Sequence, residues 1–118
     1  MMKTKRVYEK AAKSDGFRIL VDRLWPRGLT KSEAKIDLWL KEIAPSNELR
    51  KWYHQNPDKW DAFIKKYLSE IKNKYELLTQ IKNLDKEKSV ITLVYASKNL
   101  TGNNAAALMK ILSSPENK

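Results

Sequence analysis

Hydrophobic positions along the chain follow two spacings, which predict buried strands alternating with amphipathic helices. Near-continuous apolar runs over 17–24 and 90–95 are typical of central strands that are buried on both faces. From Trp60 to Ile71, apolar residues recur three and four positions apart, which predicts a helix that packs on the sheet. Weaker patterns predict a first strand over 5–8, an outer strand over 36–41, and helices over 47–54, 75–84 and 105–112.

Polar residues with strong positional preferences mark where several helices begin. Thr30 and Glu33 fit a capping box, so a single helical turn is expected there. Ser46 is suited to cap the helix that follows it. Asn56 and Pro57 are suited to the cap and the first turn of the next helix.

The alternation of strands and helices predicts one small α/β domain over 1–118, with a mostly parallel sheet of about four strands and helices packed on its faces. The two apolar strands are expected to be neighbours. The loops that follow them, 22–28 and 97–104, would then meet at the carboxyl edge of the sheet, where open α/β sheets bind ligands. We also expect an interruption of the helical pattern at Asn73, a charged turn over 85–88, and frayed ends over 1–4 and 113–118.

The charge balance favours anionic partners. The chain has 24 basic and 14 acidic residues, a formal net charge of +10, which suits phosphorylated metabolites, nucleotides, nucleic acid or acidic proteins. A solvated, lysine-rich surface is the simpler alternative. Only five of the basic residues are arginines, and two of these lie in the loop 22–28. Arginine suits bidentate recognition of phosphate or carboxylate better than lysine does.

Residue types that are missing from the sequence exclude several kinds of chemistry. There is no cysteine and one histidine, His54, so disulfides, a thiol nucleophile, and thiolate or multi-histidine metal sites within one chain are excluded. We therefore expect no metal and no cofactor. No apolar run is long enough to cross a bilayer, and the basic residues near Met1 precede no apolar stretch, so we expect a cytoplasmic protein without a membrane partner.

The loop 22–28 carries the strongest candidate site. It holds an acid, Asp22, and two arginines, Arg23 and Arg27, directly after a predicted buried strand. Asp22 and Arg23 either form a local ion pair, or Asp22 orients an arginine that binds an oxyanion. Trp25 is a candidate for stacking on a flat ring, although tryptophans more often belong to the core.

Further candidates lie around the predicted helix 47–54 and at the loop 97–104, called the late loop below. Lys98 would supply charge and Asn104 hydrogen bonds, at a helix start that is itself suited to anions. Tyr95 is either a core residue at the strand end or a hydroxyl donor. Ser46 is either a helix cap or a nucleophile, although it lacks a nucleophile-elbow motif. His54 is either a C-terminal helix cap or a general acid or base.

Several long motifs also carry a family resemblance. They are the segments 22–28, 39–46, 49–52 and 92–98, with His54, Pro57, Trp60, Phe63, Tyr67, Glu70, Asn104 and Ala105. In these motifs the chain resembles the bacterial family defined by the domain of unknown function 488, in its small YeaO-like branch. The resemblance implies no particular activity. Longer relatives are similar at the same two loops but carry cysteines after the late strand, whereas this chain has Tyr95-Ala96-Ser97-Lys98, so any thiol chemistry of the longer branch does not transfer.

The sequence leaves three classes of function open. The first is binding of a small anionic ligand in a cationic cleft at the carboxyl edge. No complete catalytic set is visible, so catalytic residues and enzymatic activity stay open, as does the oligomeric state. The second is a nucleic-acid-binding or regulatory protein that uses basic helical faces, and the third is a protein-interaction module that uses Trp39 or Trp52. The basic helical faces would comprise Lys59, Lys65, Lys66, Lys72, Lys74 and Lys82.

Overall fold

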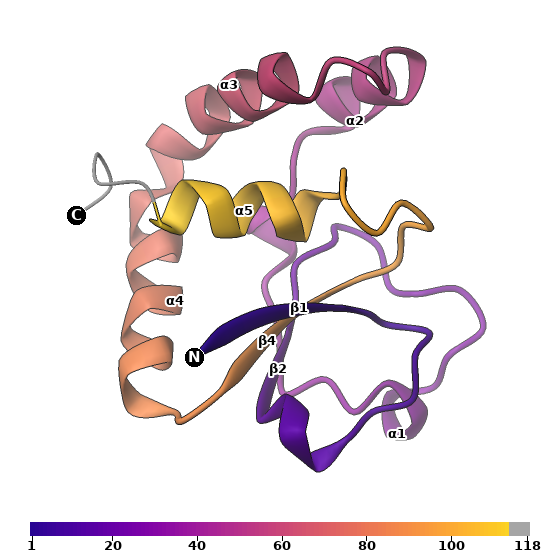
Figure 1. Cartoon of the computed structure of the whole chain (residues 1–118), viewed down its shortest axis with the longest axis vertical. Coiled ribbons are helices and arrows are strands. Elements are labelled where there is room, and N and C mark those ends of the chain that lie inside the picture. Colours follow the sequence, from indigo (N-terminus) through magenta and orange to yellow (C-terminus); the bar gives the residue numbers. More distant parts are fainter. Residues whose placement is uncertain (114–118) are drawn as a thin grey trace.

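The protein forms a four-stranded parallel sheet with helices packed against it (Figure 1). The computed structural model describes residues 1–113. The strand order is β1-β4-β2-β3, and every neighbouring pair is parallel. The predicted α/β class and parallel sheet are therefore confirmed, and the two apolar strands are neighbours as expected. The strands are β1 (Met2–Arg6), β2 (Phe17–Leu20), β3 (Leu38–Trp39) and β4 (Ile91–Tyr95).

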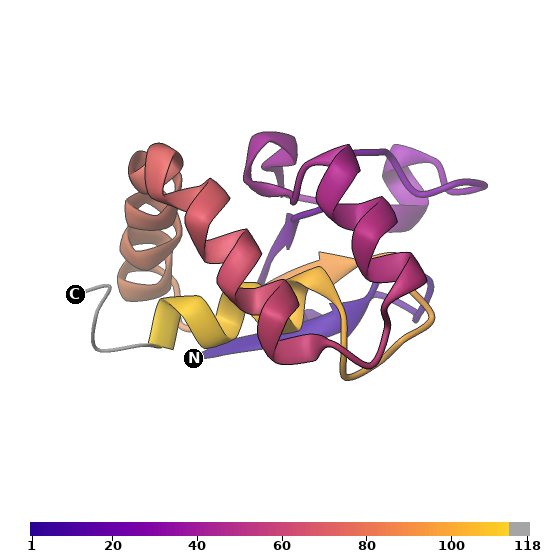
Figure 2. The same cartoon turned by 90° about the horizontal axis from the view of Figure 1, so that it is seen from above.

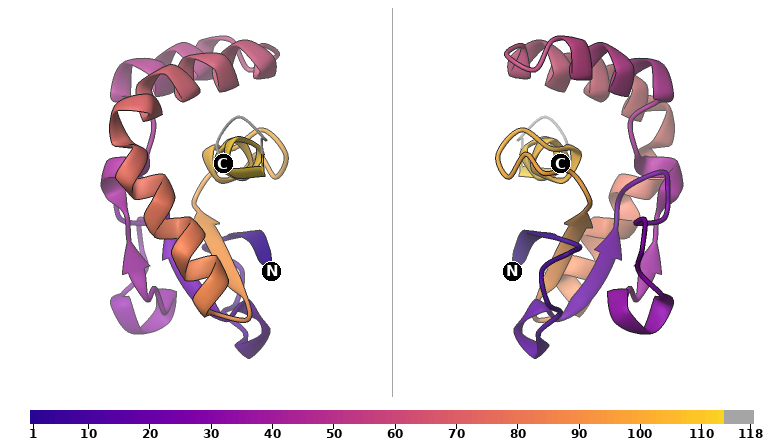
Figure 3. Two further views of the ribbon diagram at one scale, coloured as in Figure 1. Left: turned by 90° about the vertical axis from the view of Figure 1, so that its left-hand side faces the viewer. Right: turned by 90° about the vertical axis from the view of Figure 1, so that its right-hand side faces the viewer.

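One face of the sheet and three helices build the main hydrophobic core. Because side chains alternate along a strand, Ile19 of β2 and Leu93 of β4 point to the same face, where both are fully buried. Phe63, Leu78 and Leu108 belong to the same core cluster. Figure 3 shows α5 between α3 and the strands β1 and β4. The three helices are α3 (Trp60–Ile71), α4 (Tyr75–Glu87) and α5 (Asn104–Ser113).

The opposite face of the sheet is covered by irregular segments and the single-turn helix α1 (Lys31–Ala34). A smaller core cluster forms here from Val7, Ala34 and Val94. The predicted capping box is confirmed, since the Thr30 side chain accepts from the Glu33 N–H and the Glu33 carboxylate accepts from the Thr30 N–H. The central strands are thus buried on both faces, as predicted.

The ends of the strands differ from the prediction. β1 begins at Met2, earlier than the expected 5–8, and it includes residues 2–4, which we expected to be frayed. β2 ends at Leu20 and not at residue 24, because the chain turns away after the Val21 N–H donates to the Val94 carbonyl, 3.1 Å. β3 is shorter than 36–41 but occupies the predicted outer position.

Two helix boundaries near the middle of the chain behave differently. Ser46 caps α2 (Asn47–Gln55) as predicted, because its side chain accepts from the Leu49 N–H. The predicted helix start at Asn56 and Pro57 is wrong. The Asn56 side chain donates to the Trp52 carbonyl, 2.8 Å, so it closes α2, and α3 begins only at Trp60.

The remaining helices follow the prediction with shifted ends. A 3-10 turn, Lys72–Lys74, interrupts the helical pattern at Asn73 as expected. α4 continues to Glu87, so the predicted charged turn over 85–88 is wrong for residues 85–87. Ser113 belongs to α5 and is not frayed, while 114–118 lie outside the described residues. Within residues 1–113, no helix is long and apolar enough to cross a membrane.

Candidate functional site

A wide cleft lies at the carboxyl edge of the sheet. The loops that follow β1, β2 and β4 reach it from one side, and α2 lies beside them (Figures 1 and 2). A methyl group built on Gly102 would lie 2.6 Å from the Tyr53 hydroxyl, so α2 and the late loop are in close contact. The cleft has a volume of about 1320 Å³.

The two loops meet through Asp22, which confirms the expected juxtaposition. One carboxylate oxygen of Asp22 accepts from the Ala96 N–H, 2.8 Å, after β4. The other accepts from the Asn104 side-chain amide, 2.8 Å, at the start of α5. The same amide donates to the Val21 carbonyl, 2.9 Å. Asp22 and Asn104 therefore hold the cleft floor together and have their hydrogen bonds committed to the protein.

The carboxyl group of Asp22 is electrostatically unusual. Burial raises its pKa, and this effect outweighs the hydrogen bonds from Asn104 and Ala96 and the nearby positive charge of Arg50, which lower it. The backbone carbonyl of Asp22 also accepts from the Trp39 indole N–H, 2.7 Å. Each of these contacts orders the start of the loop.

Arg23 does not form the ion pair with Asp22 that the sequence left open. Within the described chain, its terminal nitrogen Nη2 donates to the Ala44 carbonyl, 3.1 Å, and its buried Nε–H has no partner. Buried N–H groups are almost always paired in proteins. This Nε–H is enclosed by protein atoms, so Arg23 contributes to the cleft through the positive charge of its half-buried side chain.

Arg27 lines the cleft from the loop after β2 and Lys98 from the loop after β4, and both are exposed. Neither side chain has a partner among the described residues. The backbone carbonyl of Arg27 accepts from the Tyr8 hydroxyl, 2.8 Å, which ties the loop after β2 to the segment after β1. The two cations are thus held at the rim with their charged groups free.

Trp25 lines the cleft but is also part of the core. Its indole N–H donates to the Leu29 carbonyl, 2.7 Å, and its ring packs edge-on against Trp39 with centroids 5.5 Å apart. The ring is half-buried against the smaller core cluster on the sheet. Trp25 is therefore mainly a packing residue that also lines the cleft.

Three cationic residues of the cleft were missed in the sequence analysis: Arg6, Arg50 and Lys51. On α2, Arg50, Lys51 and His54 follow Asn47 at spacings of three, four and seven residues, so they share one face of the helix. This face lines the cleft, while Leu49 packs into the core. The spacing is visible in the sequence and was the signal that could have found them.

Arg6 enters the cleft from the end of β1. Its Nε–H is shared between the carbonyls of Ala96, 3.2 Å, and Ser97, 3.0 Å, and its guanidinium lies 4.8 Å from the centre of the Tyr8 ring. The two terminal nitrogens of Arg6 have no partner within residues 1–113. The arginine is therefore oriented by the protein with its outer nitrogens available.

The cleft is strongly cationic. Asp22 is the one acid among the described residues that line it. Four of the five arginines in the chain lie there, together with two lysines. A cleft lined by one sign of charge concentrates ligands of the opposite sign. The cations are Arg6, Arg23, Arg27, Arg50, Lys51 and Lys98.

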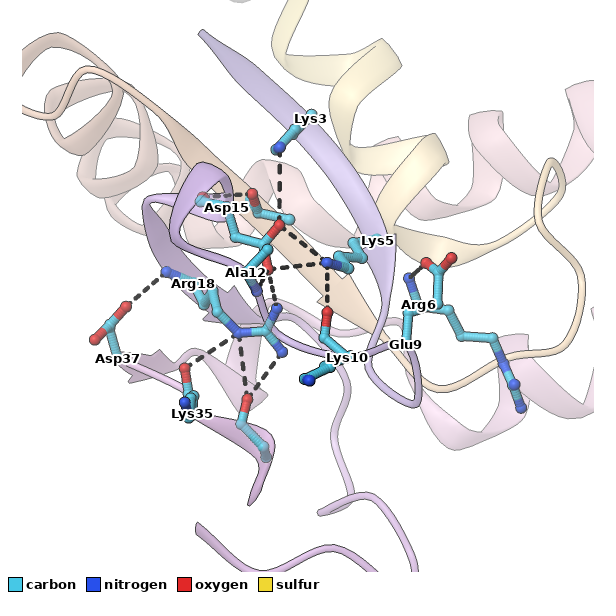
Figure 4. A network of polar contacts seen from close by, with 12 residues as sticks. Lys3, Lys5, Arg6, Glu9, Lys10, Ala12, Asp15, Arg18, Lys35 and Asp37 are labelled. Carbon is cyan, nitrogen blue, oxygen red and sulfur yellow. Dashed lines mark hydrogen bonds and ion pairs between the residues drawn. The ribbon is translucent and has the colours of Figure 1, made fainter. Parts of the chain in front are cut away.

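The fifth arginine, Arg18, belongs to a buried cluster away from the cleft (Figure 4). Its Nη1 donates to the Asp15 carboxylate, 2.7 Å, and its other nitrogens donate to the carbonyls of Ala34 and Lys35. Lys5 donates to both Asp15 oxygens at 3.1 Å. Arg18 is thus fully engaged by the protein and serves the fold.

The pKa of Asp15 is lowered by its partners. Burial of this carboxylate, which is 1% exposed, acts to raise the pKa, but hydrogen bonds from the Ala12 N–H, Lys5 and Arg18 together outweigh it. Asp15 is therefore ionised at neutral pH and is the shared counter-ion of three cations, Arg18, Lys5 and Lys3, the last at 3.8 Å.

The remaining candidates divide between the cleft and the scaffold. His54 is exposed and lines the cleft. Ser46 does not line it, because its hydroxyl donates to the Glu70 carboxylate, 2.5 Å, while capping α2. Tyr95 does not line it either. It is 3% exposed, lies in the main core, and burial raises its pKa.

Several lysines of the basic helical faces are engaged with neighbouring groups. Lys66 lies 4.8 Å from the centre of the Trp52 ring, and the Lys74 ammonium donates to the Glu42 carbonyl, 2.7 Å. Lys65 makes no such contact within the described part of the chain. No group of three or more metal-binding side chains occurs among residues 1–113.

Comparison with known proteins places this small parallel α/β domain, with its cationic cleft, in a family. The model of the inactive DUF488-N3 subclade matches residues 1–118. The chain belongs to this family, within the domain of unknown function 488.

Relatives in bacteria share most of the chain. The uncharacterised protein YeaO of Escherichia coli is 44% identical over 110 residues, which cover 93% of this chain and 95% of YeaO. The uncharacterised proteins Rv3073c of Mycobacterium tuberculosis and Mb3100c of Mycobacterium bovis are each 39% identical over 108 residues, 92% of this chain and 90% of theirs. No solved structure matches the chain.

Proposed function

We propose that the protein binds a small anionic ligand, bearing phosphate or carboxylate groups, in the cleft at the carboxyl edge of the sheet. The observation that carries this proposal is the charge of the cleft, with four arginines and two lysines against the single acid Asp22. Guanidinium groups pair with phosphate and carboxylate oxygens in bidentate geometry. A ligand with that chemistry is the one that the cleft would select.

The residues of the cleft have different roles in this proposal. Arg27 and Lys98 contact the ligand, because both are exposed and free of partners in the described chain. Arg23 adds positive charge, since its half-buried side chain also lines the cleft. Asp22 and Asn104 position the two loops and do not bind the ligand, because their hydrogen bonds join the loops to each other. This assignment revises the sequence hypothesis, in which Asn104 hydrogen-bonded the ligand and Asp22 oriented an arginine.

The family description favours binding without catalysis. The subclade to which the chain belongs is described as inactive. Ser46 and Tyr95, two of the candidate hydroxyl groups, lie outside the cleft. Without cysteine, the chain has no thiol nucleophile either. Recognition of an anion is therefore the activity that we assign to the cleft, and the reaction stays unassigned.

Thermal unfolding with added ligands tests the proposal. The panel holds inorganic phosphate, phosphorylated metabolites, nucleotides and small carboxylates. A ligand at a hundredfold excess over its Kd should stabilise the protein by about 2.7 kcal/mol. Arg27→Ala should reduce this stabilisation strongly. The control Lys86→Ala also removes one positive charge, but from the last turn of α4, which precedes the amino end of β4 and lies outside the cleft. It should leave the stabilisation by the ligand unchanged.

Two results would contradict the proposal. Equal stabilisation of wild type and Arg27→Ala would place the ligand elsewhere. Stabilisation by duplex DNA alone, equal in both variants and weaker after substitution of Lys65 and Lys59, would move the function to the basic helical faces.

A further inference from the structure

The cleft has two cationic walls, and this arrangement narrows the ligand class. Resting on the function proposed above, we propose that the ligand carries two or more linked phosphate groups, one bound by the loop wall and another by α2. The loop wall consists of Arg6, Arg23, Arg27 and Lys98, and the α2 wall consists of Arg50, Lys51 and His54.

The α2 wall is a stripe on one side of a helix, with two cations, Arg50 and Lys51, beside His54. Arg50, Lys51 and His54 are all exposed and share the face that lines the cleft. Within residues 1–113, these three side chains make one hydrogen bond, a weak one from Arg50 Nη1 to the Asn47 side-chain oxygen at 3.4 Å. The stripe thus presents positive charge that the described protein leaves uncompensated.

The loop wall holds more charge and is more firmly ordered. Arg6 is oriented by the carbonyls of Ala96 and Ser97, and Arg23 by the carbonyl of Ala44. Neither wall contributes a carboxylate except Asp22, whose oxygens are committed to Asn104 and Ala96. A single phosphate is therefore expected to bind at the loop wall and to leave the α2 wall without an anion.

The two walls belong to one site. Arg50 lies close enough to Asp22, on the cleft floor, to act on that carboxylate electrostatically. The close approach of Tyr53 to Gly102 joins α2 to the late loop. The cleft volume of about 1320 Å³ exceeds the range of roughly 300–1,000 Å³ that is usual for small-molecule sites. A phosphate chain would reach both walls and neutralise them together.

Linked phosphates fit the cations better than separate carboxylates do. Three of the wall residues are arginines whose planar forks match phosphate oxygens: Arg6 and Arg27 have free terminal nitrogens, and Arg50 makes only a weak bond to Asn47. Such a chain occurs in inorganic oligophosphate and in the tail of a nucleoside triphosphate. Both share the chemistry that the walls recognise, and the test below separates them.

Titration calorimetry with two probes tests the proposal. Inorganic phosphate and inorganic tripolyphosphate are titrated into the full chain at fixed ionic strength. Wild type should bind tripolyphosphate at least about tenfold more tightly than phosphate, because the second contact becomes intramolecular. ATP compared with tripolyphosphate tells whether a nucleoside adds affinity. Citrate, a linked carboxylate, should bind more weakly than tripolyphosphate.

Variants of the two walls should affect the two probes differently. Arg50→Ala, on the α2 wall, should weaken tripolyphosphate at least about tenfold and leave phosphate within about twofold of wild type. Alanine is the best helix former, so α2 should persist. Arg27→Ala, on the loop wall, should weaken both probes. Lys65→Ala, an exposed lysine of α3 outside the cleft, is the matched control and should change neither.

The outcomes separate this inference from the proposed function. Equal affinity of wild type for both probes, or an equal effect of Arg50→Ala on both, would overturn the two-wall inference and leave an anion site at the loop wall. Citrate binding as tight as that of tripolyphosphate would overturn the choice of phosphate. Binding of neither probe by wild type would overturn the proposed function as well.

Discussion

Replacing Asp15 by asparagine should destabilise the protein strongly, because it leaves Arg18, Lys5 and Lys3 without their counter-ion. Asp15 is 1% exposed and Arg18 is 3% exposed, and they meet at 2.7 Å. The second cation, Lys5, contacts the same carboxylate at 3.1 Å. Breaking a buried ion pair by removing one partner costs about 3–5 kcal/mol. An asparagine amide also points an NH₂ group at cationic donors, so it cannot replace the carboxylate.

Thermal and urea unfolding both measure this loss. In thermal unfolding, for a chain of 118 residues, a loss of about 3–5 kcal/mol corresponds to a fall in Tm of about 10–25 °C. The urea midpoint should fall while the slope stays unchanged, since the surface exposed on unfolding is the same. Asp58→Asn, at an exposed position whose side chain makes no hydrogen bond or ion pair among the described residues, should change stability by less than about 0.5 kcal/mol.

The pH dependence gives a second readout of the same cluster. The folded pKa of Asp15 lies below its unfolded value of 3.8, so its contribution is fully present above pH 3.8 and is lost as pH falls through the folded pKa. The stability difference between wild type and Asp15→Asn should therefore shrink in acid. A difference below about 1 kcal/mol at pH 7, or one that is independent of pH, would refute the reasoning.

Three further substitutions test the fold by urea unfolding. Tyr67→Phe removes a buried hydroxyl that donates to the Ile43 carbonyl, 2.6 Å, and should lower the free energy of unfolding by about 1–3 kcal/mol. An unchanged urea midpoint would contradict this hydrogen bond. Gly16→Ala should cost about 2 kcal/mol or more, because φ is +63° and the methyl group would meet a backbone carbonyl just before β4. Asn104→Ala should lower stability and raise the pKa of Asp22 further, and it should weaken anion binding, whereas intact binding would show that the loops hold without this bridge.

The centres of the strands and helices were predictable, and their ends were not. The apolar runs of β2 and β4 and the apolar stripe of α3 identify elements that must be buried. This requirement holds whichever residues cover them. The ends depend on single hydrogen bonds from distant residues. Asn56 was expected to start a helix, but its bond to the Trp52 carbonyl closes the preceding one. Arg18 interrupts an apolar run, and its ion pair with Asp15 explains how a central strand tolerates it.

The candidate site was predictable where one loop carried it and was missed where several elements share it. The loop holding Arg23 and Arg27 stood out because arginine is scarce in the chain. Arg6 was placed within a strand expected over 5–8, whereas it ends β1 at the rim of the cleft. The cations of the α2 stripe, Arg50 and Lys51, look in the sequence like those of any solvated helical face. The stripe lines the cleft because α2 packs against the late loop, and the sequence does not show this packing.

Mapping of backbone amide signals by two-dimensional NMR, during titration with tripolyphosphate, tests the central claim most directly. Binding in the cleft predicts that the largest shifts fall in 22–28, 47–55 and 96–104, and that they disappear in Arg27→Ala. Largest shifts along the lysine-bearing faces of α3 and α4, or no shifts at saturating probe, would contradict the assignment of an anion site to the cleft.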